Sequence, residues 1–115
     1  MEASEEDDKL RKEVWDLSLV RIEMHITEDH EQMYKLLEKA ERWLKLSIQM
    51  KLKVTRQLES ADVTFKLAMM MGDVERAVKV AKQGEQMAVI GFGRKDKIVQ
   101  DWARRKDYPV LYMIG

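Results

Sequence analysis

The chain has 115 residues, of which 45% are hydrophobic and 37% are charged, which is enough apolar material for one folded domain. It contains no cysteine, so disulfide bonds, thiolate metal sites and cysteine nucleophiles are excluded. Basic and acidic residues number 21 each, and this zero net charge disfavours general nucleic-acid binding. No stretch has the roughly 20 apolar residues of a membrane span, so we expect a cytoplasmic protein with no membrane partner.

The beginning of the chain is strongly acidic. Residues 1–8 include five acidic side chains and no basic one. A segment of this composition has little to bury, so we expect a flexible acidic head followed by a single domain over residues 9–115. Glycine and proline together number only six, and asparagine is absent, which is typical of helical bundles and of computationally designed proteins.

The pattern from Leu44 to Thr55 predicts a β-strand. Apolar residues occupy every second position, and the positions between them are polar. On a helix, with about 100° per residue, these apolar residues would scatter around the axis, whereas on a strand they share one face. Similar alternation or short apolar runs predict further strands over residues 20–26, 63–70, 87–90 and 110–114.

Helical spacing and capping residues predict three helices between these strands. Thr27 can cap the first helix, whose apolar stripe continues from Met33 to Leu44. Asp73 can cap the second helix, and the third is expected over about residues 96–105.

The order of elements predicts an α+β fold, a ferredoxin-like βαββαβ sandwich with an additional C-terminal αβ unit. Helices would cover one face of the sheet and leave the other face open. The alternative is an all-α helical bundle, which is favoured by the residue composition and by the scarcity of turn residues.

The segment from Val89 to Lys97 is the best candidate for a binding site. An expected strand, a Gly-x-Gly turn and the basic start of an expected helix follow in the order that holds phosphate groups. Asp96 stands where the dinucleotide-binding fingerprint has its third glycine, so the motif is partial. The expected anion-binding residues are Gly91, Gly93, Arg94, Lys95 and Lys97.

The open face of the expected sheet would be mostly basic. No aromatic residue lies among its side chains to stack on nucleic-acid bases, so nucleic acid is disfavoured there. A protein partner or self-association through this face is one interpretation, and a solvated face whose lysines discourage aggregation is the other. The residues that we expect to face a partner are Arg21, His25, Lys51, Lys53 and Lys66.

No pattern in the sequence predicts a catalytic centre, a metal site or a cofactor. The spacing of His25 and His30 fits no common set of metal ligands, and no serine, histidine and acid form a recognisable triad. We therefore expect a non-catalytic binding or assembly module, or a de novo designed protein with no natural activity. The alternative is a phosphate- or nucleotide-binding enzyme that uses the loop from Gly91 to Lys97.

Overall fold

The computed structural model describes residues 5, 8, 9, 12 and 30–112, and this part of the chain contains helices and no strand. The predicted α+β sandwich is therefore wrong, and the all-α alternative fits. No helix within the described residues is long and apolar enough to cross a bilayer. The elements are α2 His30–Gln49, α3 Val54–Met70, α4 Val74–Phe92, α5 Lys97–Asp107 and the 3-10 helix η1 Pro109–Tyr112.

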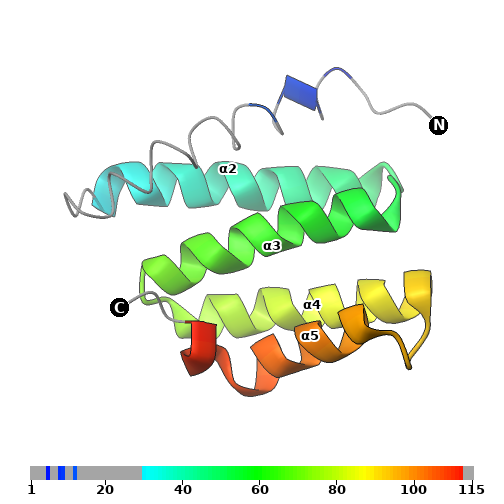
Figure 1. Cartoon of the computed structure of the whole chain (residues 1–115). Helices are drawn as coiled ribbons and strands as arrows, with labels where there is room; N and C mark the ends of the chain where they lie inside the picture. Colours follow the sequence, from blue (N-terminus) through cyan, green and yellow to red (C-terminus); the bar gives the residue numbers. More distant parts are fainter. Residues whose placement is uncertain (1–4, 6–7, 10–11, 13–29, 113–115) are drawn as a thin grey trace.

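The helices alternate in direction, and each packs against the next one in the chain (Figure 1). Their shared interior is centred on large side chains such as Trp43 of α2 and Phe65 of α3, both at most 1% exposed. Trp102 of α5 meets Phe65 edge to face, with ring centroids 6.5 Å apart, so α5 also reaches this interior.

The segment from Leu44 to Thr55 is the end of α2, a turn and the start of α3, and not the predicted strand. Ser47, expected to face solvent, is fully buried, and Ile48, expected to face the interior, is 38% exposed. Helical spacing explains both, because Ser47 lies three residues after the buried Leu44, on the same face of α2. The alternating pattern therefore combines residues of two helices and the turn between them.

A Schellman turn ends α2 without glycine or proline. The N–H of Leu52 donates to the carbonyl of Ser47, and the N–H of Lys51 donates to that of Ile48, each at 3.0 Å. Lys51 is left-handed at φ 52°, where glycine is the usual residue. Leu52 lies in the turn between the two helices, and its side chain is buried there.

The central position of α3 explains why the prediction of a strand over residues 63–70 is also wrong. α2 packs against one side of α3 and α4 against another, so most of the circumference of α3 is buried. A helix buried on most sides has an almost continuous apolar sequence, and such a run resembles a buried strand. The buried residues of α3 are Leu58, Ser60, Ala61, Val63, Thr64, Phe65, Leu67, Ala68 and Met69.

The remaining predicted strands have other outcomes. Residues 87–90 belong to the C-terminal part of α4, and residues 110–112 belong to η1. The predicted strand over residues 20–26 and the predicted cap Thr27 lie outside the described residues.

The predicted cap at Asp73 is confirmed, and the helix predicted from about residue 96 begins at Lys97, with Asp96 as its cap. The Asp73 carboxylate accepts a hydrogen bond from the backbone N–H of Arg76 at 3.1 Å, and the Asp96 carboxylate accepts one from that of Ile98 at 2.9 Å. Gly72, at φ 76°, ends α3 in a second Schellman turn immediately before Asp73. The Asp73 signal was readable in the sequence because a cap depends on only a few neighbouring residues.

Candidate functional site

The predicted anion-binding segment is divided among the end of α4, a turn and the first residue of α5. Gly91 lies in the last turn of α4, where a Cβ atom would come within 2.7 Å of the Val54 side chain. This glycine therefore allows α4 to approach the start of α3. Gly93 follows α4 at φ 86° and ψ 155°, a conformation that is almost restricted to glycine.

The start of α5 already holds an acidic group. Because the Asp96 carboxylate accepts the backbone N–H of Ile98, it lies where the sequence interpretation placed a phosphate. Arg94, Lys95 and Lys97 are exposed around this turn. Anion binding by these three cations stays a prediction.

The sheet that was predicted to present the partner-facing residues is absent from the described part of the chain. Lys51 and Lys53 lie in the turn between α2 and α3 and are exposed. Lys66 is on α3, and its ammonium group pairs with Asp62 at 2.9 Å. Arg21 and His25 lie outside the described residues.

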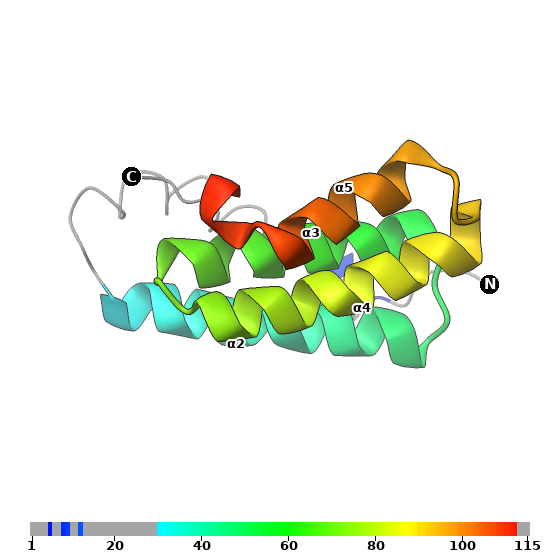
Figure 2. The same cartoon turned by 90° about the horizontal axis from the view of Figure 1, so that it is seen from below.

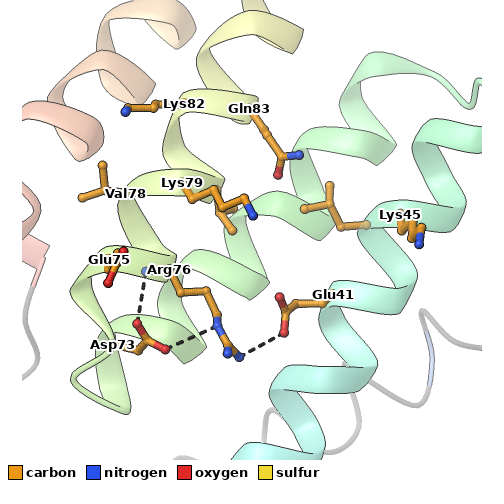
Figure 3. Close-up of a pocket in the computed structure, with 11 residues that line it drawn as sticks. Glu41, Lys45, Asp73, Glu75, Arg76, Val78, Lys79, Lys82 and Gln83 are labelled. Atoms are coloured by element: carbon orange, nitrogen blue, oxygen red, sulfur yellow. Dashed lines mark hydrogen bonds and ion pairs between the residues drawn. The ribbon is translucent and has the colours of Figure 1, made fainter.

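A groove with a volume of about 970 Å³ lies between α2 and α4. It lies between two helices that are not consecutive in the chain, since α3 comes between them. Leu44 and Val80 lie at its base, and each is only 4% exposed. Figure 3 shows Glu41 and Lys45 of α2 opposite residues of α4. The α4 side is lined by Asp73, Glu75, Arg76, Val78, Lys79, Val80, Lys82 and Gln83.

Ion pairs close one end of the groove. The guanidinium of Arg76 contacts the carboxylate of Asp73 at 3.3 Å on its own helix and that of Glu41 at 3.1 Å across the groove (Figure 3). All three side chains are between 32% and 41% exposed, so water screens this network. The network ties α4 to α2 and engages two of the three acidic groups in the groove.

The other end of the groove is rich in lysine. Lys45, Lys79 and Lys82 are exposed and form no ion pair with a described residue. In Figure 3, Lys79 and Gln83 come from α4 and lie toward Lys45 on the α2 side. This part of the groove therefore offers ammonium groups and an amide, which suits a ligand with carboxylates.

The described residues contain no group of three or more histidine, cysteine or acidic side chains that could hold a metal ion. Two side chains outside the groove between α2 and α4, Lys106 and Tyr112, have raised pKa values. The hydrogen bond between Lys106 and Glu85, at 2.8 Å, raises the pKa of Lys106. Burial raises the pKa of Tyr112, and the neighbouring Asp101 adds to this effect.

The sequence contains a weak signal for the groove. Glu41 and Lys45 are four residues apart on α2, and Arg76, Lys79 and Gln83 follow helical spacing on α4, so each helix has a polar stripe. Such stripes normally face solvent, and only the packing of α2 and α4 on α3 brings these two together.

The comparisons with known proteins add no relative. No protein-family model, no curated protein and no solved structure matches the chain.

Proposed function

We propose that the protein is a non-catalytic binding module that holds a peptide segment of a protein partner in the groove between α2 and α4. The observation that supports this proposal is the groove itself, because no other described helix fills it. Its volume of about 970 Å³ lies at the upper end of the range for small-ligand pockets, and the groove is open along both helices. A cytoplasmic location remains part of this proposal.

The charges of the groove select an acidic peptide. Arg76 already has two carboxylate partners, whereas Lys45 and Lys79 have none among the described residues. A glutamate or aspartate of the partner would form ion pairs with these lysines and so determine the orientation of the peptide. Leu44 and Val80 are each only 4% exposed, so an adjacent apolar side chain of the partner would add only a small contact with them.

Fluorescence anisotropy with a labelled 12-residue peptide of alternating Glu and Leu tests this proposal. The expected result is saturable binding that weakens at least tenfold with Lys45→Glu or Lys79→Glu, because each change replaces an attractive charge by a repulsive one. A peptide of alternating Lys and Leu is expected not to bind.

Lys97→Glu is the matched control, because it makes the same charge change at an exposed lysine outside the groove. The acidic peptide should bind this variant as it binds the unchanged protein. Equal losses for all three variants would show general charge attraction and would refute a site in the groove, as would absence of binding to the unchanged protein.

The phosphate- or nucleotide-binding enzyme stays an alternative prediction. Thermal unfolding with millimolar pyrophosphate tests it, since a ligand at 100 times its dissociation constant stabilises by about 2.7 kcal/mol. Arg94→Gln is the suitable variant, because Arg94 is exposed, whereas a side chain at Gly93 would strain the backbone whether or not an anion binds.

A further inference from the structure

Two turns lie together at one end of the helical array. α3 begins beside the end of α4, because a Cβ atom at Gly91 would touch Val54. The α2–α3 turn and the α4–α5 turn are therefore neighbours, and both lie at the right in Figures 1 and 2. Residues that are some forty positions apart in the sequence share this surface.

This surface carries a concentration of positive charge. Five exposed cations lie here, and none of them forms an ion pair with a described residue: Lys51, Lys53, Arg94, Lys95 and Lys97. Asp96 is the acidic residue of the α4–α5 turn, and its carboxylate is engaged by the backbone N–H of Ile98. Because the whole chain has no net charge, this end is distinctly positive relative to the rest. We call it the basic end and define it by these five cations.

Large apolar side chains are exposed among these cations. Ile90, in the last turn of α4, is 83% exposed, and Phe92 and Ile98 are 38% and 36% exposed. All three lie within the nine residues that also contain Arg94, Lys95 and Lys97. Apolar groups in this arrangement are unfavourable in water and favourable where a charged boundary adjoins a hydrocarbon phase.

We propose that the basic end docks on the surface of a bilayer that contains anionic lipids. The cations would lie among the lipid phosphates and carboxylates, and Ile90 and Phe92 would enter the boundary between headgroups and acyl chains. The sequence predicted no membrane partner because no segment could span a bilayer. Docking on the surface of a bilayer needs no spanning helix. The proposal is independent of the groove between α2 and α4, because none of its residues lines that groove.

The apolar residues favour a lipid surface over a nucleic acid. Single-stranded nucleic acids are held by cations together with aromatic rings on which bases stack. Phe92 is the aromatic residue of this region, and the more exposed Ile90 has no role in stacking. A lipid surface uses both residues.

Co-sedimentation with vesicles tests the proposal on the whole chain. We expect binding to vesicles of phosphatidylcholine with about 30% phosphatidylserine and none to pure phosphatidylcholine, at an ionic strength of about 0.15 M. Removal of one charge by Arg94→Gln or Lys95→Gln should weaken partitioning roughly fivefold, since each cation near such a surface contributes about that factor. Ile90→Ser, at an exposed position, should also weaken it by roughly fivefold.

Two matched controls separate docking from general attraction. Lys79→Gln removes the same charge in the groove, and Leu111→Ser removes an apolar side chain that is 69% exposed on η1. Both variants should partition like the unchanged protein. Circular dichroism of every variant verifies that the fold is retained.

Three results would overturn the proposal. The first is an equal loss with Lys79→Gln, and the second is binding that does not respond to Ile90→Ser. The third is absence of vesicle binding while a single-stranded RNA oligonucleotide binds at the same salt concentration, which would assign the cations to nucleic acid. Failure of the acidic peptide to bind the groove would leave these vesicle results unaffected.

Discussion

The indole ring of Trp102 on α5 lies directly against the backbone of α4 at Gly84. A Cβ atom at position 84 would be 2.3 Å from ring atom Cε3, closer than any real contact, and both residues are buried. The absence of a side chain at Gly84 therefore allows α5 to pack this closely on α4. A glycine within a helix costs about 0.5–1 kcal/mol relative to alanine, and here the packing of Trp102 compensates for that cost.

Gly84→Ala should therefore destabilise the protein, although alanine is the better helix former. Overpacking of a core costs about 1–3 kcal/mol, which exceeds the gain in helix propensity. The measurement is urea unfolding, with Gln83→Ala, an exposed neighbour on α4, as the control that should change little. In a Trp102→Leu background the same alanine should be tolerated, and a stabilising Gly84→Ala in the unchanged protein would contradict the observed packing.

The sequence predicted local features of the fold better than its packing. The cap at Asp73 and the start of a helix near residue 96 depend on a few adjacent residues, and both were predicted. The role of Gly84 depends on Trp102, eighteen positions later and on another helix, so its reason could not be read from the sequence. The groove was missed for the same reason, because its two sides come from α2 and α4.

The strand prediction over residues 44–55 failed because burial and polarity do not coincide there. Ser47 is buried at the crossing of α2 and α3, where its hydroxyl lies 3.2 Å from that of Ser60 and donates to the carbonyl of Leu44 at 2.8 Å. A small hydroxyl residue can satisfy its hydrogen bonds inside and allow two helices to approach closely. A prediction based on the alternation of polar and apolar residues therefore places such a serine on the solvent-facing side, although it is buried.

Aspartate substitutions at adjacent positions test this assignment. Ser47→Asp should cost several kcal/mol because it buries a carboxylate, whereas Ile48→Asp, at a 38% exposed position, should cost less than about 1 kcal/mol. Both positions are in the last turn of α2, so the unfavourable interaction with the helix dipole is common to both. Chemical denaturation measures the difference, and a larger loss for Ile48→Asp would favour a strand.

Lys51 and Gly72 occupy the same position in two successive Schellman turns, with φ values of 52° and 76°. Lys51→Gly should stabilise the protein by up to about 1 kcal/mol, because glycine adopts this conformation without strain. Gly72→Ala should destabilise it by a similar amount through backbone strain alone, since nothing lies within 4 Å of its would-be Cβ. Thermal melts should shift in opposite directions, and shifts of the same sign would contradict a left-handed Lys51.

Arg105 organises the contact between α3, α5 and η1. Its guanidinium lies 4.2 Å from the ring centroid of Trp102 and 5.6 Å from that of Tyr112, and it pairs with Asp62 of α3 and Asp101 of α5. Because the side chain is only 14% exposed, these contacts are partly shielded from water. Tyr112 is thereby placed where its hydroxyl donates to Asp101 at 3.3 Å.

This placement predicts a loss of stability at alkaline pH. Burial, with a contribution from Asp101, raises the pKa of Tyr112 in the folded protein above its ordinary value of 10.0. At a pH between that value and the pKa of the folded protein, the Tyr112 hydroxyl has lost its proton in the unfolded chain but keeps it in the folded protein. The free energy of unfolding should therefore be unaffected by this group at neutral pH and should fall as the pH rises from about 10 through the folded pKa.

Tyr112→Phe isolates this contribution, because it keeps the ring against Phe65 and Arg105 and removes the ionisable hydroxyl. Urea unfolding between pH 7 and pH 11 should show a smaller alkaline loss of stability in this variant than in the unchanged protein. Lys106, whose pKa is also raised, remains in both proteins, so its alkaline effect cancels from the comparison. The difference between their absorbance titrations near 295 nm should have its midpoint above 10. A midpoint at or below 10 would mean that the solvent reaches the Tyr112 hydroxyl freely, and η1 would then not be held against Asp101 and Arg105.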